Sequence, residues 1–193
     1  FSSDNAGNNI VVPPSHMILR TLAVNDDVAF PWFAPAGIRR GVVDNATSVG
    51  FNQSSTGEKQ TIAVSSGIRD TLQSNRLNPI SFLTGSGLTV FGQKTRHSGT
   101  SALDRVNVAR LVVFLRTQLD KLAQPFIFEP NDELTRNEIK QAVESFLLEV
   151  QGQRGLFDFA VVCDETNITP SRIYRNELYV DIAIEPVKAV VFI

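Results

Sequence analysis

The two histidines and the single cysteine are the side chains in this sequence best suited to acid–base or nucleophilic chemistry. His16 and His97 lie in polar or terminal contexts with no partner fixed beside them, so we interpret both as exposed or loosely packed. Cys163 ends an apolar run and is followed by Asp164 and Glu165. Neighbouring carboxylates raise the pKa of a thiol, whereas a nucleophilic cysteine needs a lowered pKa. A buried, inert thiol is therefore the better interpretation.

Paired carboxylates and clustered glycines do not add a site. Adjacent acidic residues occur at 26–27, 132–133 and 164–165, and solvated turns explain them better than a shared site. The glycines at 85, 87 and 92 lack the spacing of a phosphate-binding loop. Two histidines and one cysteine are too few for a closed zinc site, and no regular series of oxygen ligands is present. We predict no catalytic residue, no cofactor and no metal.

Composition narrows the class of protein further. The chain has 193 residues, with 18 basic and 20 acidic side chains, a net charge of −2 and 42% hydrophobic residues. These values are typical of a globular protein of one domain or two small ones. The near-zero charge argues against nucleic-acid binding by bulk electrostatics. No apolar run approaches 18 residues, so we expect neither a nucleic-acid nor a membrane partner.

The two ends of the sequence differ from ordinary chain ends. The sequence begins at Phe1 without a methionine, and it stops at Ile193 inside the apolar run AVVFI. Natural termini are usually polar and poorly ordered. We therefore interpret the sequence as part of a longer protein.

Two amphipathic helices are the clearest elements in the sequence. Over 104–123, which Asp104 is expected to cap, apolar residues recur every three or four positions. A second helix is expected over Thr135–Gln151. Thr135 and Glu138 fit a capping box, and Asp132 offers an alternative start one turn earlier. The predicted buried faces consist of Val108, Leu111, Val112, Leu115, Leu119 and Leu122 in the first helix, and Ile139, Val143, Phe146, Leu147 and Val150 in the second.

Three strands are predicted after these helices. They cover Phe157–Cys163, Leu178–Pro186 and Val187–Ile193, and the second alternates strictly between apolar and other residues. Two helices followed by strands indicate an α+β fold, with a mixed sheet and two long helices packed on it. The N-terminal portion is predicted to be smaller and partly irregular.

Elements in the N-terminal portion are short. Residues 1–14 are expected to form an extended, disordered or partner-bound lead, and 44–60 a loop. The remaining expected elements are a helix over His16–Val24 capped by Ser15, an ordered aromatic loop over Phe30–Gly37, a strand over Thr61–Val64, a helix over Ser66–Asn75, and strands over Ile80–Leu83 and Leu88–Phe91 joined by a glycine turn.

Basic side chains accompany the first long helix, at Arg105, Arg110, Arg116 and Lys121. A solvated helix face is the common meaning of such a pattern. A charged docking surface for a protein partner is the alternative.

Several segments taken together resemble the contractile tail sheath proteins of bacteriophages. The resemblance covers about four fifths of the chain, leaves residues 44–60 unplaced, and has Trp32 displaced by two positions relative to the family's loop. No single segment is specific, but their order is. The segments are Val12–Gly37, with VPPSHMILR and PWFAPAG; Leu77–Thr95, with LNPI, TGSG and GQKT; Asp104–Leu119, with NVARL; Phe126–Asn167, with FEPND and TR; and Leu178–Ile193.

This resemblance implies a structural, non-enzymatic subunit that polymerises around a tail tube and contracts to drive the tube through the host envelope. It implies a sheath middle domain within 1–76 and a C-terminal sheath domain over 77–193. The implied partners are neighbouring sheath subunits, the tube protein, and the baseplate and tail terminator proteins. The implied location is the virion tail, after synthesis in the host bacterial cytoplasm.

The resemblance also implies that subunits exchange strands, and we expect the apolar run at the end of the sequence to take part in this exchange. We expect a sheet edge there to accept a neighbour's strand, and residues 1–193 alone to be monomeric. A generic protein-binding module remains an alternative function, and a hydrolytic enzyme a less favoured one. The residues of the proposed strand exchange are Val187, Lys188, Ala189, Val190, Val191, Phe192 and Ile193.

Overall fold

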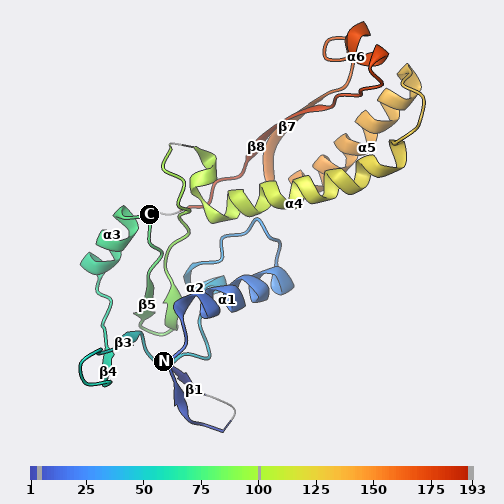
Figure 1. Ribbon diagram of the computed structural model, residues 1–193. Coiled ribbons are helices and arrows are strands. Elements are labelled where there is room, and N and C mark those ends of the chain that lie inside the picture. Colours follow the sequence, from blue (N-terminus) through green and yellow to red (C-terminus); the bar gives the residue numbers. More distant parts are fainter. Residues whose placement is uncertain (4–5, 100, 191–193) are drawn as a thin grey trace. The chain divides into compact units, whose positions relative to one another are not determined.

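The structure is a computed structural model that describes residues 1–3, 6–99 and 101–190. The chain divides into two compact units, Phe1–Ala109 (unit 1) and Arg110–Ile193 (unit 2) (Figure 1). Helices alternate with small sheets, which confirms the predicted α+β class. Among the described residues, every sheet is a single pair of antiparallel strands.

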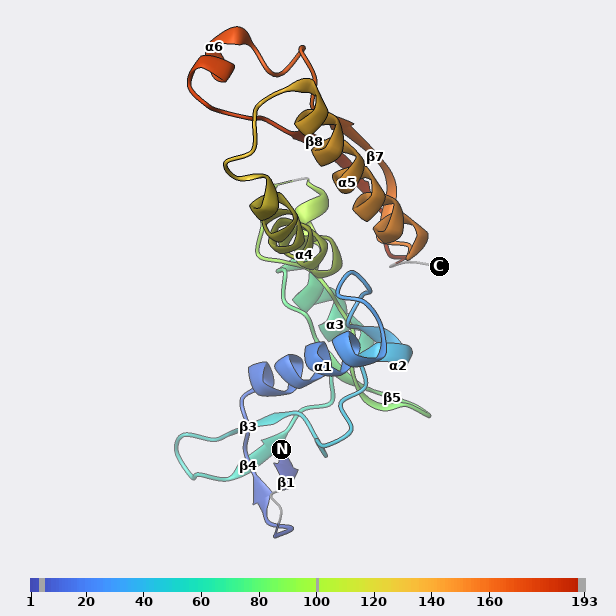
Figure 2. The same ribbon diagram turned by 90° about the vertical axis from the view of Figure 1, so that its right-hand side faces the viewer.

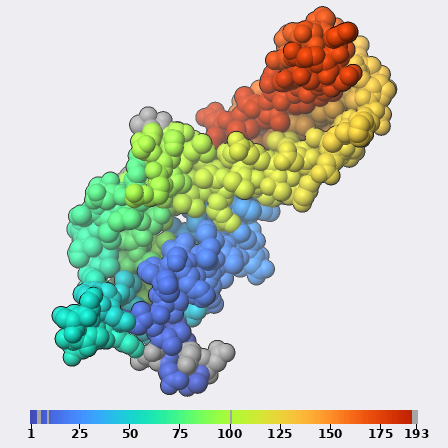
Figure 3. Space-filling model, viewed as in Figure 1, coloured from blue at the N-terminus to red at the C-terminus, as the bar shows by residue number. Residues whose placement is uncertain are grey.

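Two short hairpins replace the irregular segments expected in unit 1. β1 (Ser2–Ser3) pairs with β2 (Asn9–Ile10), and β3 (Gly50–Asn52) pairs with β4 (Lys59–Thr61). Gly50 permits the second pairing, because a Cβ there would lie 2.0 Å from the Gln60 carbonyl oxygen. The β3–β4 hairpin is mostly exposed and forms a projection of unit 1 (cyan in Figure 3). The strand expected over 61–64 corresponds to β4, which begins two residues earlier, at Lys59.

Helix α1 (Pro14–Val28) is longer than predicted at both ends. Pro13 is the N-cap residue and Ser15 lies inside the first turn, so the predicted serine cap is wrong. Proline is compatible with the first helical turn because it lacks only an N–H that would have no helical partner. Met17, Thr21 and Asn25, spaced four residues apart, form the buried face.

The aromatic segment that follows α1 is ordered, as predicted. Trp32 is buried and stacks on Phe30, with ring centroids 4.8 Å apart. The Arg40 guanidinium lies 4.9 Å from the centroid of the Phe33 ring. The short helix α2 (Gly37–Arg40) ends this segment.

The hairpin of β5 (Ile80–Leu83) and β6 (Gly87–Val90) confirms the predicted pair of strands. The Val43 N–H donates to the Leu88 carbonyl and the Val90 N–H to the Gly41 carbonyl, so residues 41–43 lie along the other side of β6. Met17, Val43, Leu88 and Val90 form a buried cluster of unit 1. Helix α3 (Ser66–Ser74) matches its prediction, and the Ser65 hydroxyl accepts from the Ile68 N–H.

Both long helices are present, with different caps from those expected. α4 (Val106–Ala123) begins after a 3-10 turn over Ala102–Asp104, so Asp104 is not its N-cap. A second such turn, Gln124–Phe126, follows α4. α5 (Glu133–Gly152) is capped by Asp132, whose Oδ1 accepts from the Thr135 N–H at 2.9 Å. The alternative start is therefore correct, and the Thr135 capping box is wrong.

The predicted buried faces of these helices are largely confirmed. Fully buried positions are Val108, Leu111 and Leu115 on α4 and Ile139, Val143, Leu147 and Val150 on α5. Phe146 is half-buried, and its ring contacts Phe114 of α4 with centroids 6.3 Å apart. No helix of the described residues has the length and hydropathy needed to cross a membrane.

In unit 2, α5 packs on a hairpin made of β7 (Leu156–Val162) and β8 (Asp181–Pro186) (Figure 2). The connection between the strands contains the short helix α6 (Pro170–Tyr174). The strand expected over 178–186 begins three residues later, at Asp181. The third predicted strand, Val187–Ile193, is wrong over residues 187–190, which lie outside any strand. Its last three residues, 191–193, are outside the described part of the chain.

Candidate interaction surface

The β7–β8 hairpin has two unpaired edges. Each of its strands has one partner among the described residues, so the outer side of each strand pairs with no other strand there. Strand edges carry main-chain N–H and C=O groups that can bind an extended segment of another chain. The hairpin is therefore the part of unit 2 best suited to accept a strand.

One face of the hairpin is apolar and faces α5. Val161 is buried, and its partner Ile182 and the pair Phe159–Ile184 are partly buried. The alternation in β8 confirms the predicted single buried face. A register shift between Leu156 and Asp158 marks a bulge in β7.

The opposite face of the hairpin carries acidic and small side chains. In its register, Asp158 lies opposite Glu185, and Ala160 lies opposite Ala183. All four residues are exposed. Directly opposed side chains project from the same face of an antiparallel pair, so this surface combines two carboxylates with a flat centre.

The apolar run after β8 leaves the sheet at Pro186. Pro186 pairs with Leu156, the first residue of β7, so no residue of β7 remains to pair beyond it. Val187 still donates its N–H to the Gly155 carbonyl at 3.2 Å. Val190 is 79% exposed, and the described part of the run thus presents apolar surface without a strand partner.

Asn167 holds the two strands of the hairpin in place, a role that the sequence analysis missed. Its amide nitrogen donates to the carbonyls of Val162 and Tyr179, at 2.8 and 3.2 Å, and to the Asp181 carboxylate at 3.0 Å. Its amide oxygen accepts from the Asp164 N–H at 3.1 Å. The turn-rich segment around Asn167 was a signal for such a residue, since asparagine side chains commonly bind nearby backbone groups in turns.

The four basic residues that were candidates for a docking face differ in setting. Arg105 precedes α4, and its guanidinium lies 3.3 Å from the Asp104 carboxylate. Arg110 is half-buried, whereas Arg116 and Lys121 are exposed. Arg110 and Lys121 are about three helical turns apart and share one side of α4, and Arg116 lies about 120° around the helix. The charges therefore do not form one stripe.

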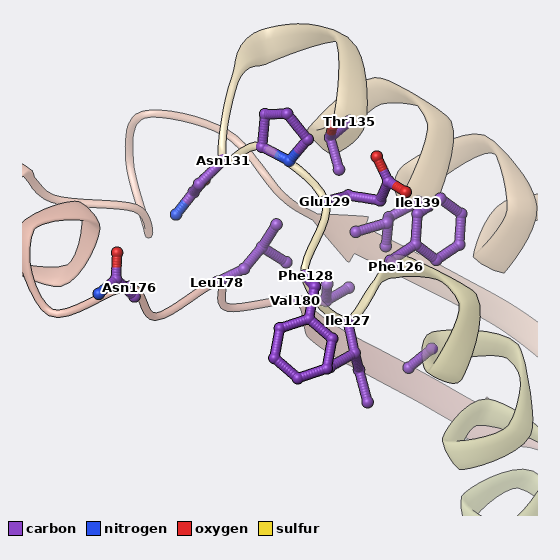
Figure 4. A pocket seen from close by; sticks show the side chains of 12 residues that line it. Phe126, Ile127, Phe128, Glu129, Asn131, Thr135, Ile139, Asn176, Leu178 and Val180 are labelled. Carbon is purple, nitrogen blue, oxygen red and sulfur yellow. The ribbon is translucent and has the colours of Figure 1, made fainter.

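A hollow of unit 2 has a volume of about 900 Å³. Figure 4 shows Phe128 and Ile127 on the loop before α5, with Leu178 and Val180 across from them. Phe128 is fully exposed and has a left-handed backbone with φ +76°. The side chains that line this hollow include one carboxylate, Glu129, and no histidine, cysteine or lysine, so it offers no nucleophile and base pair.

The two histidines and the cysteine do not form a common site in this structure. His16 and His97 are exposed, and Cys163 is buried. Burial is the main cause that raises the pKa of the Cys163 thiol, the Asp164 carboxylate raises it further, and Arg136 opposes the change. A raised pKa keeps the thiol protonated and weakly nucleophilic. Among the described residues, no three His, Cys, Asp or Glu side chains are placed to hold a metal ion.

Comparison with known proteins gives a consistent result. Residues 98–193 match the family described as phage tail sheath C-terminal domain. The tail sheath protein of Vibrio phage KVP40 is 36% identical over 182 residues, and that of Enterobacteria phage T4 is 32% identical over the same length. Both alignments cover 94% of this chain and 26% of the relative, so the chain spans about a quarter of the length of these curated relatives.

Solved structures with the same fold come from contractile injection systems. The sheath complex of the PVC extracellular contractile injection system in its contracted state has a TM-score of 0.81 at 22% identity, covering 100% of this chain and 52% of that chain. A chain of the anti-feeding prophage baseplate has a TM-score of 0.80 at 22% identity, covering 94% and 48%. At this identity, the likeness establishes the fold.

Proposed function

Because residues 98–193 match the phage tail sheath C-terminal domain family, we propose that this chain is part of a structural subunit of a contractile tail sheath. The subunit polymerises around a tail tube and contracts to drive that tube through the host envelope. One structural observation supports this proposal in addition to the family match: both outer edges of the β7–β8 hairpin are unpaired among the described residues. Such edges suit an assembly held together by strands from neighbouring subunits.

The strand-exchange element of the proposal is the run Val187–Ile193. Its described part is largely exposed and apolar, and it leaves the sheet at the point where β7 ends. A neighbour's strand would supply the hydrogen-bonding partners that β7 cannot. Arg105, Arg110, Arg116 and Lys121 are the charged residues of the proposed docking contact. Arg116 and Lys121 are the exposed ones, and they lie on different sides of α4, so each would meet a partner separately.

The remaining assignments follow from the family. We assign residues 1–76 to the sheath middle domain and 77–193 to the C-terminal sheath domain. The partners are neighbouring subunits, the tube protein, and the baseplate and terminator proteins, and the location is the virion tail after synthesis in the host cytoplasm. Membership in a family of structural proteins favours a role without catalysis. A generic binding module, the alternative, would have the same edges but would not polymerise.

Substitution of Val190 by aspartate tests the strand-exchange step in the full-length protein. Val190 is exposed, so a charge there is expected to leave the melting temperature of the monomer unchanged. The same charge in an intersubunit strand would be buried and would abolish polymerisation measured by light scattering. Phe51→Asp, at an exposed position of β3, is the control and is expected to polymerise normally. Normal polymerisation of Val190→Asp would contradict the assignment of this run.

The charged docking surface is tested separately. Arg116→Glu combined with Lys121→Glu is expected to slow polymerisation at low salt and to have less effect at high salt, because salt screens exposed charges. Equal rates for this variant and the unmodified protein at low salt would exclude these two residues from the interface.

A further inference from the structure

The outer edge of β5 in unit 1 carries main-chain groups that point away from the hairpin. Leu88 and Val90 of β6 bond to residues 41–43, so their main-chain groups face away from β5. Their register partners, Phe82 and Ile80, are therefore non-hydrogen-bonded positions of the β5–β6 pair. It follows that the N–H and C=O groups of Ile80 and Phe82 face outward, where no strand of the described residues pairs with them.

A groove runs along this edge. It has a volume of about 350 Å³ and is lined by β5, by Leu88 of β6, by residues 47–49 and by the extended segment 62–65 between β4 and α3. Its lining is largely apolar, and Ile62 and Phe82 remain 45% and 69% exposed. Apolar side chains beside free main-chain groups are the combination that binds an added strand.

We propose that an extended segment of the same polypeptide, from outside residues 1–193, adds as a strand to the outer edge of β5 and fills this groove. The segment bonds to the outward main-chain groups of Ile80 and Phe82 and places apolar side chains against Ile62. The β5–β6 hairpin is thereby part of a wider sheet.

The amount of sequence outside this region favours an intramolecular occupant. The chain spans 26% of its curated relatives, so about three quarters of each relative lies outside the aligned region. A segment of the same chain binds at a high effective concentration and does not lose the translational freedom that a second molecule loses. The inference concerns the folding of one subunit and does not depend on the proposed sheath function.

Photo-cross-linking of the full-length protein identifies the occupant. A benzophenone amino acid replaces Phe82, and a mixture of ¹⁴N- and ¹⁵N-labelled protein is irradiated and analysed by mass spectrometry. We expect cross-links to one segment outside residues 1–193, with both peptides carrying the same isotope. The same probe at Leu19, an exposed position on α1 (66%), is expected not to reach that segment. Cross-links confined to residues 1–193, or peptide pairs of mixed isotope, would overturn the proposal, and the latter would identify a second copy as the occupant.

Amide hydrogen exchange gives an independent measurement on the unmodified full-length protein. Ser81 and Leu83 bond inward to β6, so their amides are protected whether or not the groove is filled. The amides of Ile80 and Phe82 are expected to exchange as slowly as these two controls. Exchange of Ile80 and Phe82 about tenfold or more faster than Ser81 and Leu83 would show an open edge and overturn the proposal.

Discussion

Asp158 of β7 lies directly opposite Glu185 of β8, so two carboxylates share the exposed face of the hairpin. Like charges at opposed positions destabilise an antiparallel pair. Neither residue has an ion pair among the described residues. The hairpin that we propose to accept strands is thus weakened by its own surface charge.

Replacement of Glu185 by lysine tests this repulsion. Glu185→Lys turns a repulsive pair into an attractive one and is expected to raise the free energy of unfolding by about 0.2–1 kcal/mol. Urea denaturation measures the change. Asp158→Lys should give a similar gain, and the double variant, with two opposed lysines, should lose it. A loss of stability in either single variant would show that the two carboxylates do not interact.

Core truncation tests the buried helix faces. Leu115 is 4% exposed, so Leu115→Ala is expected to lower the free energy of unfolding by about 2–5 kcal/mol. Phe146 is half-buried against Phe114, so Phe146→Ala is expected to fall at the lower end of that range or below it. Leu148→Ala, at a position 57% exposed on α5, is the control and should cost little. Equal effects of Leu115→Ala and Leu148→Ala would mean that the buried face is assigned incorrectly.

Removal of the Asn167 side chain tests its role in the hairpin. Asn167→Ala leaves the Val162 carbonyl, the Tyr179 carbonyl and the Asp164 N–H without their bonds to this side chain. A partly buried polar group left without its partner costs about 1–3 kcal/mol, so we expect a loss of at least that size in urea denaturation. Asn52→Ala, at an exposed position of β3, is the control. If Asn167→Ala lowers the free energy of unfolding no more than Asn52→Ala does, Asn167 does not stabilise the hairpin.

Two hydrogen-bonded carboxylates predict a loss of stability in acid. Hydrogen bonds from Thr135 hold the pKa of Asp132 below its usual value of 3.8, and hydrogen bonds from Thr166 do the same for Asp164. A pKa that is lower in the folded than in the unfolded state adds stability above the unfolded value, and that stability is lost as the pH falls through the folded value. We therefore expect the melting temperature to fall below about pH 4. Asp132→Asn, which keeps an acceptor oxygen but does not titrate, should reduce the fall. An unchanged pH profile for this variant would contradict the assignment.

The parts of the fold that follow from local pattern were predicted well from the sequence. Leu111 and Leu147 belong to strong helical repeats, and both are almost fully buried. The alternation of β8 likewise predicted which of its sides is the more buried one. In each case, the pattern records which side chains must avoid water, and that pattern does not depend on a distant partner.

Features that depend on specific partners were not predicted. The hairpin over 50–61 is polar and exposed, so no apolar alternation indicates it, and its pairing depends on a glycine that permits close approach. Asp132 and Thr135 are both residue types that cap helices, so the sequence alone does not decide which of them caps α5. Val187 and the residues after it have the composition of a strand, but β7 ends opposite Pro186 and offers them no partner.

Negative-stain electron microscopy of the full-length purified protein tests the central claim most directly. A sheath subunit is expected to form tubes of uniform diameter, with repeating rings along their length. The Val190→Asp variant, at equal concentration and with an unchanged melting temperature, is expected to remain as separate particles. Separate particles of the unmodified protein at every concentration at which it is soluble would contradict the account.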